Sequence, residues 1–166
     1  RAIIPGRTGW LNAKQITEID FIDDPYELPW MADLQVWLDA HDLTMDYGER
    51  AMTLQVQSLI VDPHDIMLVD QGARVQILGK AFAGVDPVTL VELSTDGGRT
   101  WSCAESTYAP GPNRWTLWRF DWYPECAGVH HVEVRCRTEG GAETDPDAPT
   151  RHLPWSGGMS LEIEVV

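Results

Sequence analysis

The chain has 166 residues and carries 12 Lys and Arg residues against 26 Asp and Glu residues, which gives a formal net charge of −14 at pH 7. A surface that neutralises phosphates needs clustered cations, so this balance argues against sequence-independent nucleic-acid binding and against docking on an anionic membrane. The hydrophobic fraction of 43% is ordinary for a globular protein, and the length suits one domain with a core, alone or with a sizeable appendage.

The compartment is not defined by the sequence. No apolar run reaches the roughly 18 residues that a membrane-spanning helix needs, and no signal peptide is recognisable. The chain begins at Arg1 rather than Met, which indicates a processed chain or a piece of a longer protein. A periplasmic and a cytoplasmic location therefore both stay open.

The stretch from Pro5 to Lys14 is rich in glycine and contains two cations, Arg7 and Lys14, with Asn12 between them. Exposed backbone amides and cations together suit the binding of an anion such as a phosphate. A glycine-rich turn ahead of a strand is a common alternative. The hydrophobic residues that follow predict such a short strand (Ile16, Ile19 and Phe21).

The negative charge is concentrated in one segment. Between Glu18 and Glu49 there are ten carboxylates and no Lys or Arg, whereas the rest of the chain holds 16 acidic and 12 basic residues. The carboxylate spacing does not match an EF-hand loop, so a solvent-exposed acidic segment is favoured over a calcium site. Hydrophobic residues at helical spacing predict a short amphipathic helix within the segment (Trp30, Leu34, Trp37 and Leu38).

From about Thr53 onward, short runs with period-two alternation are separated by turn residues, which is typical of an all-β sandwich of about seven strands. The second run begins at Val75 and has small residues on one face, so another backbone or an indole can approach closely. Those small residues are Gly79, Ala81 and Ala83. We therefore predict an immunoglobulin-like (E-set) β-sandwich preceded by an acidic N-terminal extension with a short helix.

The clearest turn is Ser94-Thr95-Asp96-Gly97-Gly98-Arg99-Thr100-Trp101. Asp96 is placed to accept hydrogen bonds from backbone amides in the turn, and the two glycines permit positive φ. The same residues match the Asp-box hairpin of sialidases and related propellers. A propeller needs the motif in several blades, and this chain has a single copy, so we interpret it as a hairpin former.

The cysteines and histidines do not predict a metal site. Cys103, Cys126 and Cys136 are odd in number and include no Cys-x-x-Cys pair, which disfavours both a disulfide framework and structural zinc. His130 and His131 are adjacent, so in a strand they point to opposite faces.

Eight of the fifteen aromatic residues are Trp. Indole rings bury large areas and favour cores and interfaces alike. We interpret four of them as core and sheet-face residues, and an aromatic sugar-binding platform is the sharper alternative (Trp101, Trp115, Trp118 and Trp122).

Several of these pieces, in this order, resemble the carboxyl-terminal half of the sulfite oxidase family, the molybdopterin-dependent oxidoreductases that include eukaryotic assimilatory nitrate reductase. Each piece is common by itself, but the ordered set is specific. The resemblance covers nearly the whole chain except the acidic stretch around residues 24–50. The landmarks are Pro5-Gly6 through Lys14, Val56 to Pro63, Gly79 to Gly84, Val91 to Trp101, Trp115 to Trp122 and Val134 to Thr138.

In that family a catalytic domain binds the molybdenum cofactor, and an immunoglobulin-like domain behind it forms the homodimer. The resemblance implies that residues 1–23 end the cofactor-binding domain, 24–52 form an acidic connecting segment and 53–166 form the dimerisation domain. Lys14 stands where the family's Lys-Trp-Leu element holds the phosphate end of the pterin, although this chain reads Lys14-Gln15-Ile16. Arg7 and Asn12 are assigned to cofactor binding with it.

The resemblance implies a parent oxidoreductase that transfers an oxygen atom at molybdenum. The family's thiolate ligand to molybdenum lies in the upstream domain, so this chain alone is expected to be non-catalytic, to bind no metal and to hold no molybdopterin by itself. The expected partners are a second copy of the chain, the upstream cofactor domain and an electron-transfer partner. A free-standing immunoglobulin-like module that binds a carbohydrate or a protein is the alternative function.

The end of the chain bears on the substrate. Sulfite-oxidising members often carry Trp-Asn-x-Arg-Gly there, with the Arg in the oxyanion pocket. This chain reads Trp155-Ser156-Gly157-Gly158, with no Arg after Trp155. A guanidinium is the natural bidentate partner of a tetrahedral oxyanion, so its absence disfavours sulfite itself and leaves the substrate and the electron acceptor open.

Overall fold

A computed structural model of the chain describes residues 1–6, 9, 12–21, 23, 54–63, 67–144 and 157–166. The chain divides into two compact units, Arg1–Thr53 and Leu54–Val166. The helix predicted around Trp30 and most of the acidic segment lie outside the described residues.

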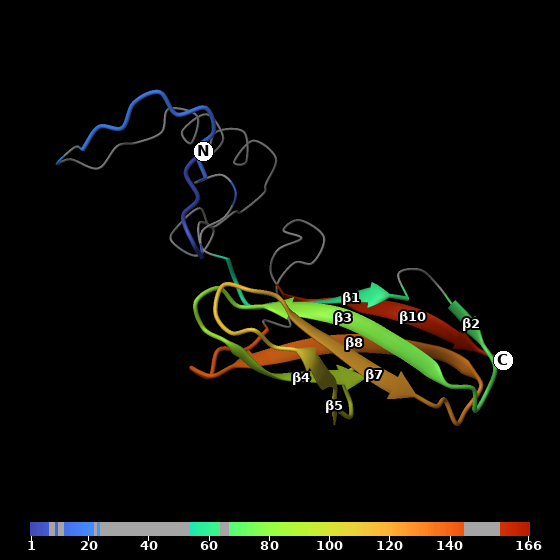
Figure 1. The fold of residues 1–166 in the computed structure, drawn as a ribbon. Coiled ribbons are helices and arrows are strands. Elements are labelled where there is room, and N and C mark those ends of the chain that lie inside the picture. The colour runs from blue at the N-terminus through green and yellow to red at the C-terminus, as the bar shows by residue number, and fades with distance from the viewer. Residues whose placement is uncertain (7–8, 10–11, 22, 24–53, 64–66, 145–156) are drawn as a thin grey trace, which may run out of the picture. The chain divides into compact units, whose positions relative to one another are not determined.

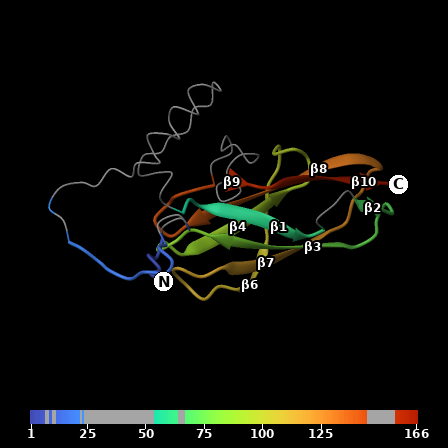
Figure 2. The ribbon, with the colours of Figure 1, turned by 90° about the horizontal axis from the view of Figure 1, so that it is seen from above.

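The regular elements of the described part of the second unit are strands, which form two layers (Figures 1 and 2). In chain order they are β1 (Gln57–Asp62), β2 (Met67–Val69), β3 (Val75–Phe82), β4 (Val88–Ser94), β5 (Ser102–Cys103), β6 (Glu105–Tyr108), β7 (Thr116–Trp122), β8 (Gly128–Thr138), β9 (Gly157–Gly158) and β10 (Ser160–Val165). One sheet has the order β6-β7-β3-β1-β9, and the other has the order β2-β10-β8-β4-β5. The predicted all-β sandwich is confirmed.

Three strands were not predicted from the sequence, namely β2, β6 and β9. Each of them is the outermost strand of its sheet. A strand of only two to four residues is too short to show a clear alternation of buried and exposed positions, so its sequence carries little pattern to detect. The four residues of β6, for example, are all exposed.

The short strand predicted at residues 16–21 is not formed. Residues 12–21 contain no strand, and the side chain of Phe21 is 99% exposed. A strand is stabilised by hydrogen bonds to a neighbouring strand, and none of the described residues pairs with this stretch. Hydrophobic residues alone were therefore an insufficient signal.

The core between the two sheets is organised around Trp118, which is fully buried. Trp118 lies opposite Gly79 in the register of β7 and β3. A Cβ atom at Gly79 would overlap the Trp118 ring and the carbonyl oxygen of Leu59 on β1. The predicted close approach of an indole to the small-residue face of β3 is thus confirmed. The rest of the core comes from inward residues of both sheets, including Ile77, Val91, Leu93, Val132, Val134, Ile163 and Val165.

The substitution Gly79→Ala tests this packing. The added methyl group would collide with an indole and with backbone, neither of which can move without disturbing three strands. We expect the free energy of unfolding to fall by about 1–3 kcal/mol, measured by urea denaturation. Gly9→Ala is the control, because no atom of the described residues lies within 4 Å of the position where its Cβ would be. Equal stabilities of the two variants would contradict the packing account.

The turn between β4 and β5 is held by the Asp96 carboxylate. Its Oδ1 accepts hydrogen bonds from the backbone amides of Arg99 (3.0 Å) and Thr100 (2.9 Å), and its Oδ2 accepts one from the Thr100 hydroxyl (2.6 Å). The Ser94 hydroxyl donates to Oδ1 (2.7 Å) and accepts from the amide of Gly98 (2.8 Å). The predicted role of Asp96 in the hairpin is confirmed.

The same hydrogen bonds, led by the one from the Thr100 side chain, lower the pKa of Asp96 from 3.8 to about 2. The folded state favours the charged carboxylate, so the stabilisation is present above the ordinary pKa and is lost as the pH falls toward 2. We expect Asp96→Asn to lower Tm at neutral pH, with a deficit against the wild type that shrinks between about pH 4 and about pH 2. Thermal unfolding over this range measures it.

Glu164→Gln is the matched control for Asp96→Asn, since Glu164 is an exposed carboxylate of β10 for which the described residues provide no hydrogen bond to the side chain. A deficit that stayed constant with pH for Asp96→Asn would show that the Asp96 charge is not what holds the turn.

Candidate functional site

The residues assigned to cofactor binding fall in the first unit. Asn12 closes a short loop there, because its Oδ1 accepts a hydrogen bond from the Ile4 amide (2.7 Å) and its own amide donates to the Gly9 carbonyl (3.2 Å). Lys14 is exposed, and Arg7 lies outside the described residues. Asn12 therefore stabilises a loop in the structure. Cofactor binding by Arg7, Asn12 and Lys14 together stays a prediction.

The described residues do not form a complete molybdenum-cofactor site. They contain no group of three or more His, Cys, Asp or Glu side chains that could hold a metal ion. What they offer is the exposed ammonium of Lys14 beside a loop in which Gly6 adopts a positive φ of 74°. Such a fragment can contact one anionic end of a cofactor but supplies no ligand set for its metal.

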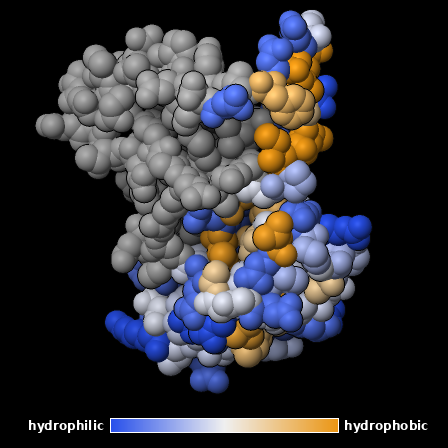
Figure 3. Space-filling model, turned by 90° about the vertical axis from the view of Figure 1, so that its left-hand side faces the viewer, coloured by the Kyte–Doolittle hydropathy of each residue, from blue (hydrophilic) through white to orange (hydrophobic). Residues whose placement is uncertain are grey.

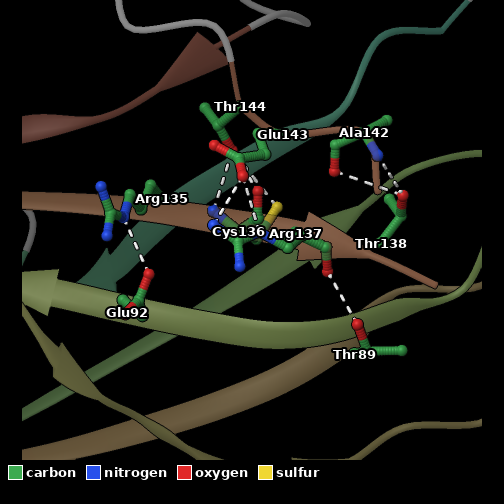
Figure 4. Close-up of polar contacts among 9 residues, drawn as sticks. All are labelled: Thr89, Glu92, Arg135, Cys136, Arg137, Thr138, Ala142, Glu143 and Thr144. Carbon is green, nitrogen blue, oxygen red and sulfur yellow. Dashed lines mark hydrogen bonds and ion pairs between the residues drawn. The ribbon is translucent and has the colours of Figure 1, made fainter. Parts of the chain in front are cut away.

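The three cysteines are free thiols. Cys103 and Cys126 are exposed, whereas Cys136 is buried between the sheets. Its Sγ contacts the carbonyl oxygen of Gln57 on β1 (3.5 Å) and the Thr144 hydroxyl (3.3 Å), and its backbone amide donates to the same hydroxyl (2.9 Å). Figure 4 shows Thr144 folded back over Cys136.

Burial is the main reason why the pKa of the Cys136 thiol rises to about 11, and the hydrogen bond with Thr144 opposes the shift. At neutral pH the thiol is therefore protonated. A protonated, enclosed thiol is a poor metal ligand or nucleophile, so Cys136 serves the packing of β8 on β1.

The two adjacent histidines point to opposite faces of β8, as predicted. The His130 ring packs against Trp122 (5.0 Å between centroids) and contacts the carbonyl oxygen of Cys126 through Nε2 (2.9 Å). His131 is exposed, and its Nδ1 lies 3.3 Å from a carboxylate oxygen of Glu162 on β10. The pair therefore cannot bind one metal ion.

The outward face of the sheet β2-β10-β8-β4-β5 is covered by ion pairs. Arg135 on β8 contacts Glu92 on β4 (2.8 Å), and Arg137 contacts Glu143 (2.6 Å), as Figure 4 shows. The Arg135 guanidinium also lies over the Trp101 ring, 4.1 Å from its centroid. The charged groups of this face are thus largely satisfied within the chain.

The outward face of the other sheet brings large apolar side chains together, whereas on the first face the exposed Leu68 and Val129 are separated by Glu164 of β10. Leu117 on β7 lies beside Tyr108 on β6, and both are exposed. Trp115, just before β7, packs against Phe82 at the end of β3, and the Lys80 ammonium lies 4.6 Å from the Trp115 ring centroid. Trp118 and Trp122 are core residues and Trp115 lies on the outward face of this sheet, which agrees with their interpretation as core and sheet-face residues.

The sequence reasoning missed this surface. Alternation along β7 directs Leu117 and Arg119 to the side opposite Trp118, and this much follows from the sequence of the strand alone. The sequence cannot place Tyr108 and Lys80 beside Leu117, because that requires the pairing of β6, β7 and β3. Across the described residues, no helix is long and apolar enough to cross a bilayer.

The fold and its two contrasting faces define an all-β, immunoglobulin-like sandwich domain, and comparison with known proteins identifies its family. The family described as "Mo-co oxidoreductase dimerisation domain" matches residues 49–144. The chain belongs to this family. The resemblance to the sulfite oxidase family stated from the sequence is confirmed.

Sulfite oxidases are among the relatives. Mitochondrial sulfite oxidase of Homo sapiens is 26% identical over 157 residues, an alignment that covers 89% of this chain and 28% of the human protein. Sulfite oxidase of Gallus gallus is 29% identical over 159 residues, covering 89% of this chain and 34% of that protein. The chain therefore spans only 28–34% of the length of these relatives.

A solved structure supports the same fold. The sulfane dehydrogenase SoxCD from Paracoccus pantotrophus matches this structure with a TM-score of 0.53 and 20% sequence identity, over 68% of this chain and 31% of that chain. At this identity the likeness concerns the fold of the sandwich.

Proposed function

We propose that this chain is the dimerisation part of a molybdenum-cofactor-dependent oxidoreductase that is similar to sulfite oxidase, and that the parent transfers an oxygen atom at molybdenum. The sandwich forms a homodimer, and an electron-transfer partner takes up the electrons. The observation that carries the proposal is the family match over residues 49–144, which coincides with most of the β-sandwich. This match favours the proposal over a free-standing binding module.

The proposal assigns residues 1–23 to the end of a cofactor-binding domain, residues 24–52 to a connecting segment and residues 53–166 to the dimerisation domain. Residues 49–166 make up less than three quarters of the chain, so an alignment with sulfite oxidase that covers 89% of it extends into the residues before 49. The similarity is thus not confined to the sandwich.

Exposed hydrophobic side chains in the first unit also support this assignment. Ile3, Ile4, Ile19 and Phe21 are all exposed, and Figure 3 shows orange hydrophobic residues on the surface of the molecule among blue polar ones. Several large exposed apolar side chains are typical of a region that packs against another domain or chain. The cofactor-binding domain of the parent is the partner that we propose for it.

Within the parent, Lys14, Arg7 and Asn12 contribute to the phosphate end of the cofactor site. When bound, molybdopterin supplies the metal-centred oxygen-atom transfer. The role of this chain is to add positive charge and hydrogen-bond donors on the phosphate side, since cations and amide groups bind phosphates by charge-assisted hydrogen bonds. The ligands of the metal come from the linked domain.

The longest native gene product tests the proposed function. We expect sedimentation to give a dimer, and elemental and pterin analysis to give about one molybdenum and one pterin per chain. The 166-residue chain alone is expected to form a dimer without metal, because its described residues lack a ligand set. A native product that is monomeric and free of molybdenum and pterin would overturn the proposal.

A substitution of Lys14 in the same native product tests the cofactor-facing segment. Loss of one charge-assisted contact to a phosphate in Lys14→Ala should weaken retention of the pterin about 10-fold or more, measured as pterin content after dialysis. Lys14→Arg keeps the charge and should retain most of the pterin. Arg99→Ala, which removes an exposed cation of the β4–β5 turn, is the control and should leave the pterin content unchanged. Equal pterin contents in Lys14→Ala and Arg99→Ala would remove Lys14 from the site.

A further inference from the structure

We propose that two copies of this chain associate through the outward face of the sheet β6-β7-β3-β1-β9, with Leu117 at the centre of the contact. The inference rests on the proposed function as a dimerisation domain, and it adds which of the two sandwich faces is used. It is carried by the side chains, the register and the charges of that face.

A row of four side chains crosses this face from strand to strand. Tyr108 on β6 pairs with Leu117 on β7, Leu117 pairs with Lys80 on β3, and Lys80 pairs with Leu59 on β1. Directly paired residues of antiparallel strands project from the same side of the sheet. Leu117 is 43% exposed and Tyr108 is 54% exposed, so the row begins with two large side chains that nothing in the described sandwich covers.

The neighbouring Trp115 extends the row with a rigid aromatic surface. Its ring is fixed between Phe82, with 5.2 Å between the ring centroids, and the ammonium of Lys80. Trp and Tyr side chains that are already held in place lose little conformational freedom on association and are common energetic centres of interfaces. Trp115, Leu117 and Tyr108 together therefore offer a preformed contact.

Charge favours a second copy as the occupant of this face. In a two-fold symmetric dimer a face meets itself, so any net charge on it is doubled across the contact. The outward positions of this sheet and their ion-pair partners carry three cations and three carboxylates, which balance. They are Arg74, Lys80 and Arg119 with Asp62, Glu105 and Asp121.

The outward face of the sheet β2-β10-β8-β4-β5 does not have balanced charges. Its outward positions and their ion-pair partners carry five carboxylates and two guanidinium groups, a net charge of −3 with His131 neutral (Glu92, Glu133, Glu143, Glu162 and Glu164 with Arg135 and Arg137). Two such faces would repel each other, and their arginines are already paired within one chain. In a chain with a net charge of −14, a balanced apolar face is the one suited to self-association.

Leu117→Arg in the full 166-residue chain tests the inference against Val129→Arg. Val129 is a 57% exposed residue of β8 on the opposite face, so it receives the same new side chain at a comparable exposure. We expect Leu117→Arg to raise the dimer dissociation constant at least about 100-fold, because two guanidinium groups would meet at the centre of an apolar contact. Val129→Arg should leave the constant within a factor of about three. Sedimentation over a dilution series gives the constants, and circular dichroism verifies the fold.

The outcomes separate this inference from the proposed function. A wild-type chain that stays monomeric at every concentration would overturn both. A wild-type dimer that persists in Leu117→Arg, or that is lost in Val129→Arg instead, would overturn the assigned face and leave the function as a dimerisation domain in place. Should Leu117→Arg not fold, Tyr108→Arg on the exposed edge strand takes its place, with the same expected loss of the dimer and the same contradicting result.

If Leu117→Arg leaves the dimer of the longest native product intact and instead makes its cofactor-binding part sensitive to limited proteolysis, the face packs against that linked domain. That result would also overturn self-association through this surface.

Discussion

The close contact of the Trp118 ring with Gly79 is the constraint on which the rest of the sandwich depends. Only a residue without a Cβ allows the indole to lie over the junction of β3 and β1, so the position of the ring fixes the register of three strands. Side chains alternate along a strand. Burial of Trp118 therefore directs Leu117 and Arg119 outward. The packing of Trp118 in the core thus determines which side chains of β7 lie on the surface of this sheet.

The two outward faces use polar groups in different ways. On the sheet that contains β8, cross-strand pairs such as Arg135 with Glu92 satisfy charges inside one chain. On the sheet that contains β7, the Glu105–Arg119 pair leaves room for an uncharged centre at Leu117. Exposed ion pairs contribute little to stability, so the difference matters mainly for association. The charged face of the sheet with β8 stays hydrated, whereas the face of the sheet with β7 can be desolvated at its centre with a small loss of free energy.

Sequence patterns predicted the parts of the fold that have a buried face. Trp118, Gly79 and Val132 each belong to a run in which alternate residues face the core, so their strands were recognisable, and Asp96 with Ser94 identified the β4–β5 turn. The row across Tyr108, Leu117 and Lys80 was not predictable, because it depends on a bulge. The irregular register between Ser106 and Tyr108 brings Tyr108 to the side of Leu117, whereas simple alternation from Glu105 would direct it inward.

For the proposed cofactor-binding residues Arg7, Asn12 and Lys14, the sequence predicted the residue types but not their arrangement. The reason also distinguishes the two proposed roles of the chain, cofactor binding and self-association. A phosphate site needs converging cations and donors, and a metal site needs several ligands at one point. The described residues bring together neither of these, and Asn12 uses its side chain to close a loop on Ile4. Self-association needs a different arrangement, a wide surface without net charge and with rigid anchors. The ten carboxylates between Glu18 and Glu49 lie outside the strands in the sequence, so other residues set the charge balance of that sheet face, and the acidic segment can serve solubility separately.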